Sequence, residues 1–431
     1  MKIIRHTDAD FSDQLAQLNR RAAPTPQVEA TVSEILEAVR TGGDEALITL
    51  TKKFDGADLA KGTLRVSPEE MTAACDAVSP EVREAVAAAK FNVERFAEES
   101  MRRDWSMTNA QGAEVGERFQ PFQRVGVYVP GGSAPLVSTA IMTVTLATTA
   151  GVPEIVVTTP CDAYGNVNPA LLYALSEAGA HEVYKIGGAQ ALAALAYGTD
   201  TILPVTKVFG PGNAYVMEAK RQVFGTVAVD LLPGPSEVLV LADETANPAF
   251  VAADLLAQAE HDPVSLIGLV TPSGALLEKV QKEVAKQKPF LSRVHIVDQV
   301  LERGTFLMQV QDFAQGVSVA NGYAPEHLSL ICEDEDKWLP EIRTSGGIFL
   351  GNYSPIAAGD FLAGPSHELP TGGAGKSFAG LTVDQFQRRT SVVKFDREAI
   401  AKSAPIISTF CGVEGLDAHA NSAMIRLAEE L

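Results

Sequence analysis

Apolar residues recur between residues 28 and 39 at the spacing of one helix face. The positions are Val28, Val32, Ile35, Leu36 and Val39. Intervals of three and four residues bring side chains to the same side of a helix. The pair Gly42-Gly43 predicts the end of this helix, and Asp44 is a plausible cap for the next one.

Between Val125 and Asp243 the pattern changes to short β-branched runs that alternate with segments rich in Ala and Leu. The runs predicted as strands are Glu154–Thr158, Glu182–Ile186 and Glu237–Leu241. Such alternation is typical of βαβ units around a largely parallel sheet. The charge-free stretch 125–153 is interrupted by Pro and Gly, so we interpret it as a glycine-rich loop followed by a buried helix rather than a membrane span.

A second region with the same alternation follows. We expect a helix over 248–261, a strand over 265–270, a helix over 274–287, and strands over 293–297 and 327–331. The segment that begins near Asp384 differs and ends in a helix with an apolar stripe at Leu416, Ala420, Met424, Leu427 and Leu431. A terminal piece this short cannot bury a core of its own, so it must pack on another domain or subunit.

Composition narrows the class of protein. A chain of 431 residues with 46% hydrophobic content predicts two or more globular domains. The formal charge of −19 argues against nucleic acid or an anionic membrane as a partner. It is compatible with a cationic small substrate, although solubility explains it equally well. Four scattered cysteines without a CxxC spacing and an N-terminus without an apolar signal core predict a cytoplasmic protein.

The adjacent residues Glu326 and His327 are the first candidates for chemistry, because they lie at the edge of an apolar run. A carboxylate beside an imidazole can take a proton from a substrate and can also activate a water. A Glu-His dipeptide alone would carry little weight, so its meaning depends on other segments.

Three further segments hold residue types that bind metal ions or substrates. They contain Gln258 and His261, Asp360 and His367, and Glu414 and His419. A helix would place Gln258 and His261 on one face, where both could reach one ion, and imidazole with oxygen ligands suits zinc. The alternatives are a polar helix face for the first pair, a turn-forming aspartate for Asp360 and a helix-surface pair in the last segment.

Glycine-rich loops follow several strand-like runs. They are Tyr128–Pro135, Gly187–Ala191 and Phe209–Asn213, and Pro233–Glu237 adds the hydroxyl of Ser236. Backbone amides in such loops can hold phosphate, but none of the three matches GxGxxG, and simple βα turns are an alternative. From these residues alone we predict a metal-assisted enzyme on an α/β scaffold.

Eight ordered segments together resemble the histidinol dehydrogenase family over essentially the whole chain. They are VGVYVPGGSAPL (125–136), GGAQALAALAYGT (187–199), FGPGNAYVMEAKRQV (209–223), LLPGPSEVLVLAD (231–243), DLLAQAEHD (254–262), YAPEHL (323–328), GDFLAGPSHELPT (359–371) and EGLDAHANS (414–422). The resemblance implies two incomplete Rossmann-like α/β domains with parallel-rich sheets, one inserted in the other, and small terminal extensions used in dimerisation. Implied boundaries are an extension at 1–25, an α/β domain of 26–127 with 238–380 that carries the zinc ligands and the catalytic pair, an NAD-binding domain at 128–237, and a dimerisation tail at 381–431.

The resemblance also implies residue roles. Zinc would be held by Gln258, His261 and Asp360 of one chain and His419 of the other chain of a homodimer. His327 would be the general base and Glu326 its companion. The substrate would meet the zinc ligands together with Ser236, His327, His367 and, across the dimer, Glu414. NAD would meet Tyr128, Gln190 and Asn213.

The implied reaction is the oxidation of L-histidinol to L-histidine with two NAD⁺, the last step of histidine biosynthesis. A paralogous zinc and NAD dehydrogenase for another small alcohol or diol is the main alternative. A zinc hydrolase that uses Glu326 to activate a metal-bound water is a further one. It would not need the three glycine-rich loops, and a non-catalytic scaffold would have no use for the Glu326–His327 pair.

Overall fold

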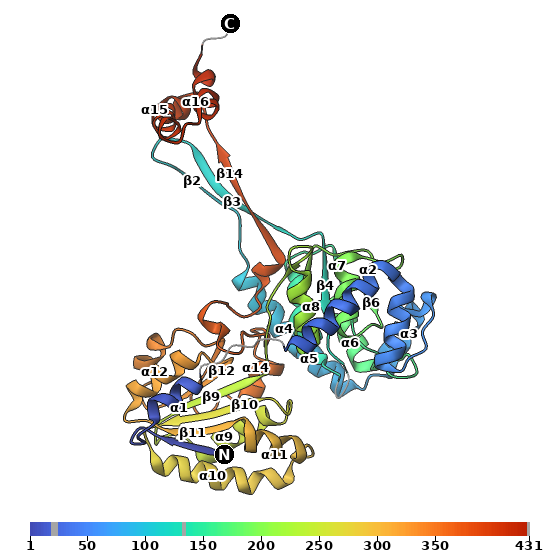
Figure 1. The fold of residues 1–431 in the computed structure, drawn as a ribbon, viewed down its shortest axis with the longest axis vertical. Helices are drawn as coiled ribbons and strands as arrows, with labels where there is room; N and C mark the ends of the chain where they lie inside the picture. The colour runs from blue at the N-terminus through green and yellow to red at the C-terminus, as the bar shows by residue number, and fades with distance from the viewer. Residues whose placement is uncertain (19–24, 132–134, 429–431) are drawn as a thin grey trace.

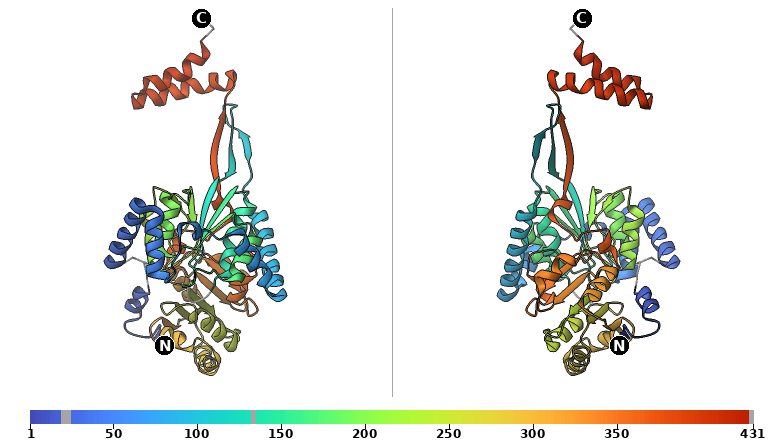
Figure 2. Two further views of the ribbon diagram at one scale, coloured as in Figure 1. Left: turned by 90° about the vertical axis from the view of Figure 1, so that its right-hand side faces the viewer. Right: turned by 90° about the vertical axis from the view of Figure 1, so that its left-hand side faces the viewer.

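Two parallel β-sheets covered by helices organise the body of the molecule, and a slender arm projects from it (Figures 1 and 2). The structure is a computed structural model that describes residues 1–18, 25–131 and 135–428. Residues 132–134 of the predicted glycine-rich loop 128–135, residues 19–24 of the predicted extension 1–25 and Leu431 of the terminal stripe therefore lie outside the described residues. The predicted α/β class with parallel-rich sheets is confirmed.

One sheet has five parallel strands in the order β6-β5-β4-β7-β8. Its strands are β4 Arg124–Tyr128, β5 Glu154–Thr158, β6 Glu182–Tyr184, β7 Lys207–Phe209 and β8 Ala228–Val229, and its helices are α5 Val137–Thr149, α6 Pro169–Ala178, α7 Gly188–Tyr197 and α8 Ala214–Val223. When these strands are numbered 1 to 5 along the chain, their spatial order is 3-2-1-4-5. This arrangement opens a crevice between the first and fourth strands. The buried helix expected after residue 128 is α5. No helix in the described ranges combines the length and apolar character of a membrane span.

The amino-terminal helices cover this first sheet. They are α2 Pro26–Asp55, α3 Pro68–Ala77 and α4 Pro80–Ser100, and they pack against α5 to α8. The predicted break lies at Gly43, whose φ of 52° interrupts α2. The carboxylate of Asp44, expected to act as a cap, accepts hydrogen bonds from the hydroxyl and backbone N–H of Thr201. Residues 26–100 thus share a core with the segment 124–229, which differs from the implied grouping of 26–127 with 238–380.

The second sheet has six parallel strands in the order β1-β11-β10-β9-β12-β13. Its strands are β1 Lys2–Arg5, β9 Glu237–Ala242, β10 Leu266–Thr271, β11 Thr305–Gln309, β12 His327–Ile331 and β13 Gly347–Leu350. Its helices include α1 Phe11–Gln17, α9 Pro248–Ala259, α10 Gly274–Gln287, α11 Val294–Arg303, α12 Phe313–Tyr323, α13 Glu335–Trp338 and α14 Ile356–Phe361. Apart from the edge strand β1, the order is again 3-2-1-4-5, so the two sheets are built alike.

The predicted strand at 293–297 is wrong, because these residues lie at the start of helix α11. Ile296, Val297 and Val300 are buried on one side of that helix, which packs against α9. Val297 and Val300 lie one and four residues after Ile296, a spacing that places all three side chains on one face of a helix. A short apolar run alone does not distinguish a helix from a strand. The strand of this unit follows as β11.

The arm is a three-stranded antiparallel sheet with helices at its tip (Figure 2). It is formed by β2 Trp105–Thr108, β3 Glu114–Pro121 and β14 Gln387–Lys394, and it carries α15 Arg397–Glu414 and α16 Asp417–Met424. Residues 381–386 still belong to the body, where Phe386 stacks on Phe209 with ring centroids 3.9 Å apart. At the tip Phe410 and Val413 are 65% and 85% exposed, so within one chain the terminal helices leave apolar surface uncovered.

Candidate active site

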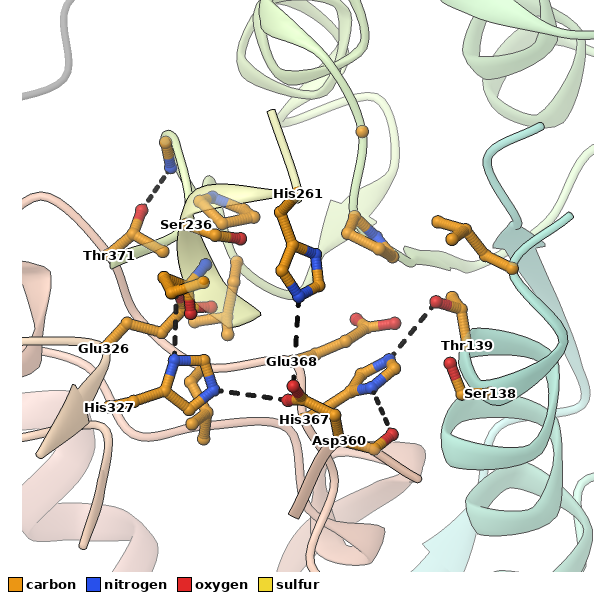
Figure 3. A pocket seen from close by; sticks show the side chains of 18 of the residues that line it. Ser138, Thr139, Ser236, His261, Glu326, His327, Asp360, His367, Glu368 and Thr371 are labelled. Carbon is orange, nitrogen blue, oxygen red and sulfur yellow. Dashed lines mark hydrogen bonds and ion pairs between the residues drawn. The ribbon is translucent and has the colours of Figure 1, made fainter. Parts of the chain in front are cut away.

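A pocket of about 220 Å³ lies between the carboxyl edge of the first sheet and the amino edge of the second (Figure 3). The loops after β7 and β8 and the start of α5 form one side, and the segments before β9 and β12 with the loop after α14 form the other. Seven predicted site residues line it, namely Ser236, Gln258, His261, Glu326, His327, Asp360 and His367. The fold thus brings together residues far apart in the sequence.

The start of β12 positions Glu326 and His327. The chain turns into this strand through Ala324, a non-glycine residue with a φ of 52°. The backbone carbonyl of Glu326 then accepts a 2.8 Å hydrogen bond from the N–H of Gly347. The Glu326 side chain accepts the backbone N–H of Glu237 at 2.8 Å, and Nδ1 of His327 lies 3.1 Å from the Glu237 carbonyl. Neighbouring strands therefore hold both side chains at the pocket wall.

These contacts determine which nitrogen of His327 can act as a base. A carbonyl oxygen only accepts, so Nδ1 must carry the proton that it donates to Glu237, and Nε2 is the basic nitrogen of the neutral ring. Nε2 is buried, lies 3.5 Å from Oδ1 of Asp360 and has no hydrogen-bond partner in the described part of the chain. The Glu326 carboxylate lies 3.5 Å from Nδ1. The basic atom is therefore free for a ligand.

The electrostatics of the pair follow from burial and mutual charge. Burial raises the pKa of Glu326 to about 8, against the opposing effect of His327. Burial alone would lower the pKa of His327, but the carboxylates of Glu326 and Asp360 outweigh it and raise that pKa to about 9. The pKa of Asp360 is lowered despite burial, because its carboxylate lies 3.5 Å from Nε2 of His327, which becomes a donor when that ring is protonated, and other imidazoles lie nearby. Shifts of this kind are typical of proton-transfer sites.

Gln258, His261 and Asp360 form a group of possible metal ligands beside this pair. Gln258 is 1% exposed at the end of α9, and neither of its amide atoms has a hydrogen-bond partner among the described residues. His261 lies three residues further along the chain, with its Nε2 4.0 Å from Oδ2 of Asp360. An unsatisfied buried amide beside an imidazole and a carboxylate fits a cation that accepts N and O ligands. No cluster of three His, Cys, Asp or Glu side chains suited to a metal occurs in ranges 1–18, 25–131 and 135–428, and the candidate set described here consists of one imidazole, one carboxylate and one amide.

His367 links the two sides of the pocket. Its Nδ1 lies 2.9 Å from the carbonyl of Asp360 and its Nε2 3.2 Å from the hydroxyl of Thr139 on α5. Burial lowers the pKa of His367, so the ring is neutral at neutral pH. Nδ1 then donates to Asp360, and the Thr139 hydroxyl donates to Nε2. Thr139, Glu237 and the buried pocket residue Glu368 were not predicted, since nothing in their local sequence indicates these long-range contacts.

The remaining predicted residues lie outside the pocket wall. Glu414 and His419 are exposed in the terminal helices at the tip of the arm, remote from the pocket of their own chain (Figure 1). Tyr128, Gln190 and Asn213 lie instead around the carboxyl edge of the first sheet. Tyr128 and Gln190 are buried, and the Tyr128 hydroxyl accepts the N–H of Gly188 at 3.2 Å. Asn213 caps α8 by accepting the N–H groups of Tyr215 and Val216.

The loop before α8 makes a close approach to β4. Gly210 has a φ of +109°, and a Cβ there would lie 2.0 Å from the backbone oxygen of Tyr128. Only glycine allows the loop after β7 to lie this close to the first strand. The crevice between β4 and β7, where α/β proteins of this strand order bind ligands, is thus shaped by the FGPGN segment.

The fold and the pocket define an α/β enzyme built on two parallel sheets, with a buried Glu–His pair in the pocket between them. The histidinol dehydrogenase family model matches residues 18–427. Histidinol dehydrogenases from Heliobacterium mobile and Xylella fastidiosa are 43% and 44% identical, covering 95% and 99% of this chain and 96% and 99% of their own lengths. The crystal structure of histidinol dehydrogenase from Elizabethkingia anophelis matches with a TM-score of 0.95 at 37% identity, over 99% of this chain and 98% of that one. The chain belongs to the histidinol dehydrogenase family of oxidoreductases.

Proposed function

We propose that this protein oxidises L-histidinol to L-histidine in two successive steps with NAD⁺. The observation that carries the proposal is the buried Glu326–His327 pair, whose free Nε2 lies in the same pocket as Gln258, His261 and Asp360. Family membership supports the substrate, and the 3-2-1-4-5 sheet with its crevice at the pocket supports a dinucleotide.

His327 serves as the base in both oxidations. In the first, Nε2 takes the hydroxyl proton while the adjacent carbon loses a hydride, which gives the aldehyde. Glu326 then takes a proton from water as that water adds to the aldehyde, and the protonated His327 returns its proton to the former carbonyl oxygen, which gives the hydrate and restores the base. In the second oxidation His327 takes a hydroxyl proton of the hydrate, a second hydride leaves, and the acid forms. NAD⁺, when bound, accepts one hydride in each oxidation.

Gln258, His261 and Asp360 would hold zinc, together with His419 of the partner subunit. Zinc, when bound, supplies a positive charge that orients the amine and imidazole nitrogens of histidinol. A positive charge held at Asp360 would also offset the effect of that carboxylate on the pKa of His327. The three residues of one chain would leave one position of a four-coordinate zinc site open, and His419 of the partner subunit would fill it.

A homodimer places the arm tip of each chain over the pocket of the other. The exposed apolar residues of the arm support this arrangement, because single chains rarely leave such surface uncovered. His419 and Glu414 would then reach the pocket from across the dimer, where Ser236 and His367 are further substrate contacts. Tyr128, Gln190 and Asn213 would contact NAD around the crevice. The four free cysteines are consistent with a cytoplasmic location.

The test is the number of NADH molecules formed per histidinol by zinc-loaded protein, read at completion with limiting substrate. Two NADH with histidine as product support the proposal. One NADH would mean that the second oxidation fails or that the natural substrate is another alcohol. No NADH from folded, zinc-containing dimers would overturn the proposal and direct the search to other alcohols or to hydrolysis.

Glu326→Gln separates the two oxidations. An amide cannot take a proton from water, so we expect oxidation of added histidinaldehyde to slow by about a hundredfold, in the range that general base catalysis contributes. Reduction of the aldehyde with NADH needs no water and should slow less than tenfold by the same argument. Glu333→Gln, at an exposed glutamate, is the matched control. Equal slowing in both directions would contradict the water-activating role.

A further inference from the structure

Glu368 is a buried carboxyl group in the pocket that the proposed steps leave unused. Its residue is only 7% exposed, and Oε1 has no hydrogen-bond partner within the described ranges. The backbone is fixed on both sides, because its N–H donates to the Ser366 hydroxyl at 3.3 Å and its carbonyl accepts from Leu381 at 2.8 Å. In Figure 3 the carboxyl group points into the pocket, away from His327 and toward the side formed by α5. A buried polar group held without a partner indicates a missing ligand.

The surrounding charges favour the neutral acid. Lys220, which is fully buried, forms an ion pair with Asp230 and donates to the carbonyl of Gly210 at 2.7 Å. Asp230 in turn accepts the N–H of Gly210 at 2.9 Å. Lys220 is thus paired with Asp230, and an ionised Glu368 would bring a second carboxylate to this pair. Lys207 also interacts with Asp230, but its ammonium group donates to the carbonyl of Gln385 at 2.9 Å. Burial and the charge of Asp230 raise the pKa of Glu368 well above its ordinary value, against the opposing effect of Lys220.

Glu368 approaches the carboxyl edge of the first sheet from the other domain. Asp230 follows β8, and Gly210 follows β7 at the crevice beside β4, so the carboxyl group lies on the dinucleotide side of the pocket. Glu326 and the candidate metal ligands belong to the second domain. A ligand group that meets Glu368 therefore belongs to the part of the cofactor that enters the pocket, which is the nicotinamide end that must approach the substrate.

A neutral carboxylic acid has one O–H donor and one carbonyl acceptor side by side. A primary carboxamide presents the complementary carbonyl acceptor and N–H donor, so the two groups can form a pair of parallel hydrogen bonds. We propose that Glu368 binds NAD by pairing, as an uncharged acid, with the carboxamide of the nicotinamide ring. This inference rests on the proposed use of NAD.

Binding of reduced cofactors to the full-length protein tests the pairing without catalysis. NADH, its 3-acetylpyridine analogue and ADP-ribose are titrated calorimetrically in the absence of histidinol. The analogue keeps the carbonyl but lacks the amide N–H, and ADP-ribose lacks the ring altogether. Glu368→Met removes both the donor and the acceptor of the side chain at similar size. Glu368→Gln keeps one donor and one acceptor. Glu244→Gln, at an exposed glutamate, is the control.

We expect wild-type protein to bind the acetylpyridine analogue about tenfold more weakly than NADH, the effect of losing one hydrogen bond in a buried site. Glu368→Met should bind NADH at least tenfold more weakly, bind ADP-ribose as wild type does, and no longer distinguish NADH from the analogue. Glu368→Gln should stay within about threefold of wild type for NADH, because its amide is also neutral.

Three results would overturn the inference. Equal wild-type affinity for NADH and the analogue would do so even if Glu368→Met does not fold. Unchanged NADH binding by folded Glu368→Met, or a loss in Glu368→Gln as large as in Glu368→Met, would do so as well. Those results leave the proposed function standing, whereas a wild-type dimer that binds no NADH would remove the NAD assignment and the inference with it.

Discussion

Replacing His327 by asparagine is expected to lower kcat for histidinol oxidation by about a thousandfold, within the range that a positioned general base contributes. The asparagine amide can still donate a hydrogen bond to the Glu237 carbonyl, as Nδ1 of His327 does in the wild type. It has no basic nitrogen at the position of Nε2. Because the same atom serves both oxidations, oxidation of added histidinaldehyde should fall by a similar factor. Rates of single turnovers with each substrate measure the two effects separately.

The zinc content of the His327→Asn variant distinguishes a base from a structural residue. Nε2 of His327 lies 3.5 Å from Asp360, so loss of the ring could also disturb the candidate metal site. We expect zinc to remain bound at the wild-type stoichiometry, measured by metal analysis after gel filtration. His295→Asn, at an exposed histidine on α11, controls for the substitution itself. Wild-type turnover, or a loss of activity that follows a loss of zinc, would contradict the role as base.

The parts of the fold that the sequence predicted well are those with local causes. Strands β5 and β12 and helix α10 lie at their predicted residues, because alternation and helical spacing are properties of neighbouring positions. The strand expected at 293–297 failed because a short apolar run satisfies both a strand and a helix face. The packing of α2 to α4 on the first sheet depends on contacts between distant segments, and the helix spacing of residues 28–39 carries no information about them.

The candidate site shows the same division. Resemblance placed Gln258, His261, Asp360 and the Glu326–His327 pair in one pocket, and the structure brings them together. The hydrogen bond from Thr139 to His367 joins residues 228 positions apart, and the environment of Glu368 depends on an ion pair in another domain. Such groups become recognisable as functional only when burial and missing partners are known. The two sheets have the same strand order, but the first borders the pocket with its carboxyl edge and the second with its amino edge. The βαβ pattern of the sequence cannot indicate this difference.

The arm tip lies far from the pocket of its own chain, and this separation predicts that active sites are shared between subunits. Helices α15 and α16, which contain Glu414 and His419, lie at the arm tip (Figure 1), while the residues they are expected to join line the pocket between the two sheets. If the sites are shared, each contains body residues of one subunit and tail residues of the other, as in a two-fold symmetric dimer. His419→Ala and His327→Asn homodimers should each be nearly inactive, because every site in either one lacks a required imidazole.

Mixing the two variants after reversible dissociation should restore activity from near zero. In a mixed dimer one site combines the intact body of the His419→Ala subunit with the intact tail of the His327→Asn subunit. Random reassortment makes half of the dimers mixed and restores one of their two sites, so about a quarter of wild-type activity is expected. Turnover after mixing at equal concentrations, with the subunits distinguished by affinity tags, measures this fraction.

The matched control pairs His419→Ala with Glu414→Gln. Both changes lie in the tail, so every site of a mixed dimer receives one defective tail, and mixing should give no more activity than the average of the two parents. Recovery in the first mixture without recovery in the control requires that body and tail come from different chains. Mixed dimers that form but stay inactive in the first mixture would show that His419 serves the pocket of its own chain. The arm would then have to fold back on its own body, and the metal site could no longer be shared.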